Sequence, residues 1–237
     1  MPESTPVHPV RRRVIVAGGL GALGIAVAQA YLAAGHRVAV IDRAAEVPAA
    51  LPAPGDQFLA IGGIDLTDPP AAERAVAEVA ARFGGIDTLV NVAGAFQWEP
   101  IATGSNETWR LLFETNVITC ATMCRAVVRH LEAGGRIINV GAAAAASPSA
   151  GMGPYAAAKS AVASLTKALA AELSERGITV NAVLPSIIDT EKNRAAMPDA
   201  DRRGWVAPQS IADVILYLSS DAARAITAGL IPVTQAT

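Results

Sequence analysis

The stretch Val14-Ile-Val-Ala-Gly-Gly-Leu-Gly-Ala-Leu-Gly24 decides the fold. An apolar run typical of a buried strand breaks into glycines and then opens a segment rich in Ala and Val, which is typical of a helix. Gly18 and Gly19 permit a tight turn, Gly21 lets the backbone approach a pyrophosphate, and Gly24 lets the helix pack close to the strand. The stretch therefore predicts a dinucleotide-binding βα unit, with the phosphates at the helix N-terminus.

An acidic residue is expected at the end of the next strand of such a unit, and Asp42 stands there. A carboxylate at this place accepts hydrogen bonds from the adenosine ribose hydroxyls and repels a 2′-phosphate, which favours NAD(H) over NADP(H). The neighbouring Arg43 leaves NADP(H) open, because its guanidinium can turn toward a 2′-phosphate or remain a solvated surface charge.

Short β-branched runs alternate with longer Ala-rich amphipathic stretches along the rest of the chain, which predicts repeated βα units and a parallel sheet. We expect one α/β domain over residues 1–237, a Rossmann-type doubly wound sheet of about seven strands with helices on both faces. The expected strands are Val14–Ala17, Arg37–Ile41, Gln57–Ile61, Thr88–Val92, Arg136–Val140, Thr179–Val183 and Leu230–Val233. Ligands gather at the carboxyl ends of such strands.

Composition excludes several classes of function. The formal charge of −2 gives no positive field for nucleic acid. The three histidines are scattered, and Cys120 and Cys124 have too few partners to hold a metal, so we expect no metal site and a reducing, cytoplasmic location. The opening residues 1–12 are polar and rich in proline, so we expect a flexible segment and neither a signal peptide nor a membrane anchor.

Further motifs resemble those of the short-chain dehydrogenase/reductases, in the expected order over nearly the whole chain. They include Asp65 in Asp-Leu-Thr, Asn91-Val-Ala-Gly94, and Asn181-Ala-Val-Leu-Pro185 followed by Thr190. The family's first glycine motif is matched with two small departures, Ala17 and Ala22. The cofactor-binding residues that we infer from the turn and from the resemblance are Gly18, Gly21, Ala22, Leu23, Gly24, Asp42, Arg43, Asp65, Leu66, Asn91, Ala93, Gly94, Tyr155, Lys159, Pro185, Ile188 and Thr190.

Tyr155-Ala-Ala-Ala-Lys159 is similar to the family's catalytic signature. Lys159 follows Tyr155 by four residues and shares its helix face, so its ammonium is expected to lower the phenol pKa and to hold the nicotinamide ribose. The phenol would then exchange a proton with the substrate as hydride moves to or from nicotinamide. The resemblance also implies that Asn116 holds a water that connects Lys159 to solvent.

Ala142 stands where most family members place a serine that polarises the substrate carbonyl. Loss of such a donor costs about 2.7 to 4 kcal/mol of barrier, so an ordinary ketone would react slowly unless Ser147 or a backbone donor replaces it. The dihydropteridine reductase branch, which this chain also resembles at Gly151-Met and around Asn193, has alanine here because its quinonoid substrate is an activated imine. Three hypotheses remain: an oxidoreductase for a small carbonyl, alcohol or conjugated imine; a nucleotide-sensing or scaffold protein with weakened catalysis; and a dehydrogenase for an alcohol whose carbonyl product is polarised by backbone donors or Ser147.

Residues 190–206 fall where the family carries a mobile substrate lid. Trp98 and Trp205 are candidates to flank a flat substrate ring, and packing of loops onto the domain is an equally reasonable role for them. The resemblance further implies a homodimer or homotetramer, assembled through the helices that carry Asn116 and Tyr155.

Overall fold

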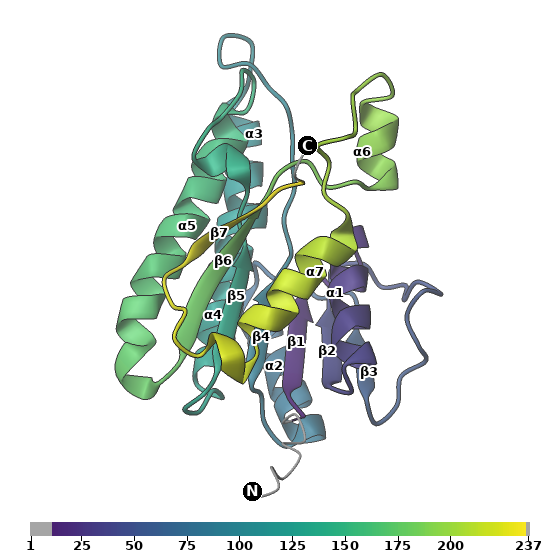
Figure 1. Ribbon diagram of the computed structural model, residues 1–237, viewed down its shortest axis with the longest axis vertical. Helices are drawn as coiled ribbons and strands as arrows, with labels where there is room; N and C mark the ends of the chain where they lie inside the picture. The colour runs from purple at the N-terminus through teal and green to yellow at the C-terminus, as the bar shows by residue number, and fades with distance from the viewer. Residues whose placement is uncertain (1–10, 236–237) are drawn as a thin grey trace, which may run out of the picture.

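A computed structural model describes residues 11–235 of the chain. Seven parallel strands form one sheet in the order β3-β2-β1-β4-β5-β6-β7 (Figure 1). The strands are β1 (Arg13–Ala17), β2 (Arg37–Ile41), β3 (Phe58–Ile61), β4 (Thr88–Asn91), β5 (Arg136–Val140), β6 (Thr179–Pro185) and β7 (Leu230–Val233). The fold class is therefore confirmed, and the strands differ from the prediction only by one or two residues at their ends.

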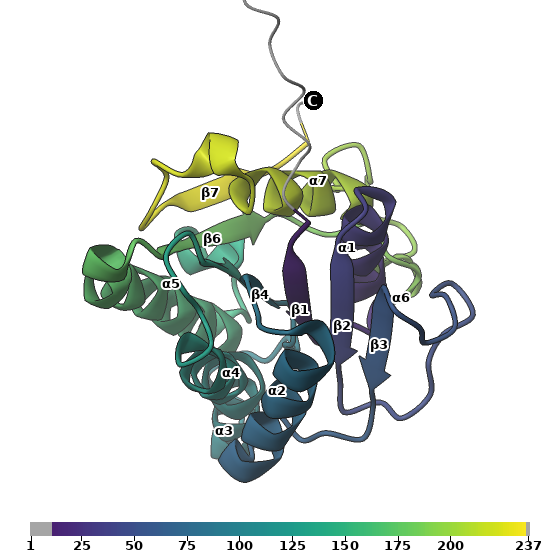
Figure 2. The ribbon, with the colours of Figure 1, turned by 90° about the horizontal axis from the view of Figure 1, so that it is seen from below.

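Helices cover both faces of the sheet, as Figure 2 shows. On one side lie α1 (Ala22–Ala33) and α7 (Pro208–Leu218), which pack against each other. On the other side lie α2 (Pro69–Phe83), α4 (Thr119–Val128) and α5 (Gly153–Leu173). The remaining helices are α3 (Asn106–Phe113), the π-helical turn η1 (Glu114–Ile118), α6 (Glu191–Ala196) and the short 3-10 turns η2 (Ala143–Ala145), η3 (Ser174–Arg176) and η4 (Asp221–Ala223).

Alternation along each strand divides the core into two layers. In β1, Ile15 and Ala17 belong to the cluster under α2, α4 and α5, whereas Val14 and Val16 belong to the cluster under α1 and α7. This follows from the two-residue period of a strand, which sends successive side chains to opposite faces. Both faces are apolar, as a parallel sheet between helices requires.

Polar side chains cross the middle of one layer. Asn139 in β5 lies opposite Asn91 in β4, and the Asn91 amide donates to the Asn139 Oδ1 at 2.9 Å. The Asn139 amide in turn donates to the Thr166 hydroxyl of α5 at 2.9 Å. These bonds fix α5 against the strands that precede the site.

The expected flexibility of residues 1–12 is wrong for Arg12, and residues 1–10 lie outside the described residues. Arg12 is 8% exposed, its backbone N–H donates to His36 Nδ1 at 3.1 Å, and its guanidinium pairs with Asp221 at 2.6 Å. The charge pair and the backbone bond to Arg37 anchor the chain before β1 begins.

Candidate active site

The glycine turn after β1 is built from close backbone approaches. Gly18 has φ +80°, and a Cβ there would lie 2.5 Å from the Ala93 nitrogen. A Cβ on Gly24 would collide with the Gly18 carbonyl oxygen, so α1 can pack this close to the turn only because residue 24 is glycine. Gly21 caps α1 without a side-chain hydrogen bond, and the space at its Cβ position is open to within 3.9 Å. The N-terminus of α1 is thus free to receive a phosphate.

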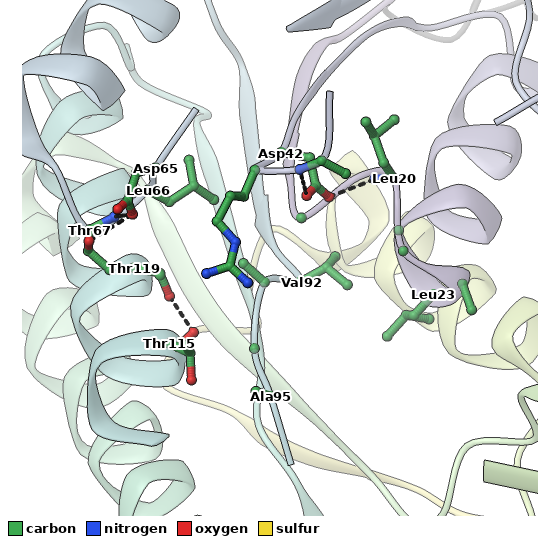
Figure 3. Close-up of a pocket in the computed structure, with 18 residues that line it drawn as sticks. Leu20, Leu23, Asp42, Asp65, Leu66, Thr67, Val92, Ala95, Thr115 and Thr119 are labelled. Carbon is green, nitrogen blue, oxygen red and sulfur yellow. Dashed lines mark hydrogen bonds between the residues drawn. The ribbon is translucent and has the colours of Figure 1, made fainter. Parts of the chain in front are cut away.

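This turn forms one wall of a cavity of about 450 Å³ at the carboxyl ends of the strands. Figure 3 places Leu20 and Leu23 on one side of the cavity and Asp65, Thr115 and Thr119 on the other. Predicted residues that line it are Gly18, Gly21, Ala22, Leu23, Gly24, Asp42, Arg43, Asp65, Leu66, Ala93 and Gly94. The cavity thus brings together most of the residues predicted to bind a dinucleotide.

Asp42 holds its carboxylate between two backbone amides, Leu20 N–H at 2.9 Å and Ala44 N–H at 3.0 Å (Figure 3). A carboxylate has about four acceptor positions, so two remain for ribose hydroxyls. Asp65 accepts from the Thr67 backbone at 2.9 Å and from its hydroxyl at 2.7 Å, and these bonds lower the pKa of Asp65. Both carboxylates are oriented by the loops that carry them.

Sequence reasoning missed seven residues of this lining: Leu20, Ala44, Thr67, Val92, Ala95, Thr115 and Thr119. Thr115 and Thr119 belong to the long helical stretch that carries Asn116, and the Thr119 hydroxyl donates to the Thr115 carbonyl at 2.8 Å. Their four-residue spacing puts them on one helix face, but only the tertiary position of that face turns it toward the cavity.

Asn91 lies elsewhere. Its side chain is 4% exposed and points into the interior network with Asn139 and the Cys124 thiol. Its contribution is to the packing beneath the cavity, because its amide nitrogen donates to residues of both β5 and α4.

Lys159 is buried beside this cavity. The residue is 4% exposed, and its ammonium donates to the Val140 carbonyl at 2.8 Å. A Cβ on Gly94 would lie 3.3 Å from the ammonium nitrogen and 2.5 Å from Asn116 Oδ1. The missing side chain of Gly94 therefore makes the room that Lys159 and Asn116 share.

Asn116 sits in the π-helical turn η1, where the extra residue of the turn redirects its side chain. Its amide donates to the Leu112 carbonyl at 2.8 Å and to the Ala95 carbonyl at 3.0 Å. Its Oδ1 is buried and has no hydrogen-bond partner among the described residues. A buried acceptor so close to an ammonium is suited to hold one water molecule.

Tyr155 stands one helical turn before Lys159, and the ammonium lies 6.0 Å from the centre of its ring. Burial raises the pKa of Tyr155 to about 12 and lowers the pKa of Lys159 to about 8. The expected lowering of the phenol pKa is therefore wrong for this structure. The ammonium is turned to the Val140 carbonyl, and the loss of water around the phenol dominates.

Ala142 lies two residues after the end of β5, immediately before η2, and is 5% exposed, so no side-chain hydroxyl stands where the family's serine would. Ser147 is exposed on the loop after η2, one turn beyond Ala143. The hydroxyl of Ser160 donates to the Ala145 carbonyl at 3.0 Å and so holds this loop on α5.

The structure shows the loop contacts of both tryptophans, and Trp98 is 59% exposed. Trp98 donates from Nε1 to the Ala150 carbonyl at 2.9 Å, and its ring fills the place of a Cβ on Gly151. Trp205 is 7% exposed, with the Arg202 guanidinium 5.7 Å from its ring centre. Both indoles tie loops to the domain.

Residues 190–206, the segment expected to be a lid, follow β6, whose last residue is Pro185. Ile188 pairs with Val206 in an isolated bridge, which closes the segment into a loop. Thr190 caps α6 by accepting from the Asn193 backbone at 3.2 Å. These three predicted residues lie at the base of the loop, beside the carboxyl end of β6.

Two general features bear on the class of protein. Among residues 11–235 no group of three His, Cys, Asp or Glu is placed to hold a metal. One helical stretch, Asn106–Val128, is long and apolar enough by composition to cross a membrane, but 56% of its apolar window is buried inside the fold, as in a core helix.

Comparison with known proteins agrees with the geometry. Residues 12–201 match the family model described as short chain dehydrogenase. The chain belongs to the short-chain dehydrogenase family. It is thus an NAD(P)-dependent oxidoreductase, with the seven-stranded sheet typical of these enzymes.

Three relatives illustrate the match. The sorbitol dehydrogenase of Cereibacter sphaeroides is 37% identical over 183 residues, which are 76% of this chain and 72% of that protein. A short-chain dehydrogenase/reductase structure from Brucella melitensis has a TM-score of 0.87 and 29% identity, covering 95% of this chain and 96% of that one. A short chain dehydrogenase from Burkholderia cenocepacia, in complex with NADP, has a TM-score of 0.82 and 32% identity over 94% and 96%.

Proposed function

We propose that this enzyme transfers hydride between NAD(H) and a small carbonyl, alcohol or conjugated imine, with Tyr155 as the group that exchanges a proton with the substrate. The observation that carries the proposal is the cluster around Gly94, where Asn116 and the buried Lys159 converge next to the phenol at the edge of the dinucleotide cavity. Bound nicotinamide would supply or accept the hydride.

The residues of the chain would handle the proton. With a pKa of about 12, the Tyr155 phenol is protonated at neutral pH and is suited to donate to the atom that gains charge, which favours reduction. Lys159, held by the Val140 carbonyl, would hold the nicotinamide ribose. The unsatisfied Asn116 Oδ1 would keep a water near the ammonium for reprotonation.

Ala142 supports an activated substrate. Without a second side-chain donor, a plain ketone would lose about 2.7 to 4 kcal/mol of transition-state stabilisation. A conjugated imine such as a quinonoid dihydropterin, a diketone or a quinone needs less polarisation. The alternative is a nucleotide-sensing or scaffold protein that binds the dinucleotide and has lost most of its turnover, for which Ala142 is the supporting feature.

A turnover experiment separates the two. We expect the purified protein to oxidise NADH in the presence of at least one member of a panel of quinonoid dihydropterin, diketones and quinones. Tyr155→Phe should lower that rate at least 100-fold with a much smaller change in NADH affinity, because the substitution removes only the hydroxyl that exchanges the proton. A protein that binds NADH but turns over none of these substrates would favour the nucleotide-sensing alternative. A fully active Tyr155→Phe variant would refute the role of the phenol.

For the cofactor we propose NAD(H) as the preferred form. The free acceptor positions of the Asp42 carboxylate support this, since a 2′-phosphate placed there would meet a negative charge. Arg43 lines the same cavity and supports NADP(H) as the second possibility.

Asp42→Asn tests the preference, because an amide keeps an acceptor for Leu20 N–H and removes the charge. We expect the wild type to bind NADH at least tenfold more tightly than NADPH in fluorescence titrations, and the variant to lose most of that ratio. Tighter NADPH binding by the wild type, or an unchanged ratio in the variant, would contradict the proposal.

We also propose that the chain forms a homodimer or homotetramer and works in the cytoplasm. Four large apolar side chains of α3 and η1 are exposed: Trp109, Leu111, Phe113 and Ile118. Three of them line a surface hollow of about 460 Å³ on the helix that also carries Asn116. A second copy of this helix would cover such a patch, which monomers seldom leave open. The buried free thiols Cys120 and Cys124 suit a reducing compartment.

Sedimentation measures this assembly directly. We expect the wild type to have the mass of two or four chains, and Phe113→Glu to shift it to a smaller species, because a carboxylate would be desolvated in the interface. Val47→Glu, at an exposed apolar side chain outside α3 and η1, is the control and should leave the mass unchanged. A monomeric wild type would refute the assembly.

A further inference from the structure

Phe96 places an aromatic ring directly beside the reacting phenol. Its ring centre lies 5.0 Å from that of Tyr155 with an angle of 88° between the planes, an edge-to-face contact. The ring is nevertheless 50% exposed. Part of the Phe96 side chain therefore packs on Tyr155, while the other part is accessible to solvent next to the phenol.

The contacts that hold this ring are those that build the catalytic cluster. The Ala95 carbonyl, immediately before Phe96, accepts from the Asn116 amide at 3.0 Å. Two residues earlier, the Ala93 backbone N–H donates to the Ala17 carbonyl at 2.9 Å. The backbone that leads into Phe96 is thus fastened to the sheet on one side and to the helix of Asn116 on the other.

The chain after Phe96 is fastened as well. Trp98 is bonded to the Ala150 carbonyl, and the Glu99 backbone N–H donates to the Gly151 carbonyl at 2.8 Å. The Glu99 carboxylate accepts from Ser105 N–H and from the Thr108 hydroxyl, each at 2.6 Å. A half-exposed phenylalanine between two anchored stretches is a fixed surface feature, unlike a side chain on a loose loop.

The surroundings give this ring a chemical meaning. The side chain of Ala142 offers no hydrogen-bond donor, and the Lys159 ammonium is turned to the Val140 carbonyl. Among the side chains placed here by the structure, Tyr155 supplies the proton and Phe96 supplies apolar aromatic surface. A flat conjugated group gains edge or face contacts with such a ring, whereas a small aliphatic compound gains little.

We propose that Phe96 determines substrate specificity, by forming a rigid aromatic wall against which a flat, conjugated substrate packs next to the Tyr155 hydroxyl. The inference rests on the proposed function, because it concerns the substrate of that same site. It assigns the enzyme to planar unsaturated carbonyl or imine compounds rather than to polyols or acyclic ketones.

The test measures ligand binding and turnover separately. The probes are 9,10-phenanthrenequinone, which is planar and conjugated, and 2,3-butanedione, which is small and acyclic. Dissociation constants are measured by fluorescence quenching with the protein saturated in NAD, and KM and kcat are measured with NADH. The variants are Phe96→Ala, Phe96→Leu and Phe96→Tyr, with Ile101→Ala as the control, since Ile101 is an exposed apolar residue of the same loop.

Phe96→Ala should weaken binding of the planar probe at least tenfold and raise its KM by a similar factor, with less than a threefold change for butanedione and for NADH. Phe96→Tyr should keep the wild-type affinity for the planar probe, whereas Phe96→Leu should lose it, because an aromatic face is required. If Phe96→Ala lowered kcat equally for both probes, Phe96 would only support Tyr155, and the proposal would be wrong. The proposal would also be overturned if the variant bound the planar probe as tightly as the wild type does, or if the wild type did not bind that probe. Selective binding without turnover would instead leave the wall in place and refute the oxidoreductase function.

Discussion

The active site depends on the burial of one lysine ammonium. Burying a charged amine is costly, and none of the ion pairs among residues 11–235 involves Lys159. The fold compensates with the Val140 carbonyl at the end of β5, which accepts from the ammonium at 2.8 Å. The buried Asn116 Oδ1 lies across the gap left by Gly94 and makes no direct hydrogen bond to the ammonium. The hydrogen bond from the Asn139 amide to the Thr166 hydroxyl fixes the position of α5 on the sheet. These features of four separate elements have one common effect, which is to place Lys159 beneath Tyr155.

Much of the fold could be predicted from local sequence because its signals are local. The β-branched runs give strands, and the glycines at 18 and 24 follow from steric limits that no other residue meets. Features set by distant packing could not be predicted. The direction of the Tyr155 pKa depends on how much water reaches the phenol, and the cavity lining by Thr115 and Thr119 depends on which helix face meets the sheet. The anchoring of Arg12 by Asp221, more than 200 positions later, is equally invisible in the sequence.

The missing hydroxyl at Ala142 and the aromatic ring of Phe96 both make the surroundings of Tyr155 less polar. The candidate site offers a phenol that stays protonated at neutral pH and an aromatic surface beside it, and Ala142 adds no side-chain donor. Such a site stabilises charge that the substrate can itself delocalise. On the proposed function, the family scaffold provides the cavity and the Tyr155 and Lys159 pair, and local changes around this pair would set the substrate.

The free energy of unfolding as a function of pH tests the buried lysine most directly. The pKa of Lys159 falls from 10.5 in the unfolded chain to about 8 in the fold. Between these values the unfolded state binds more protons, so wild-type stability should rise with pH, by about 3 kcal/mol at most relative to Lys159→Met, and the difference should be constant below pH 8. Lys167→Met removes an exposed lysine from the same helix and is the control, for which no such change is expected. A difference between wild type and Lys159→Met that stays constant from pH 7 to pH 10 would contradict the account.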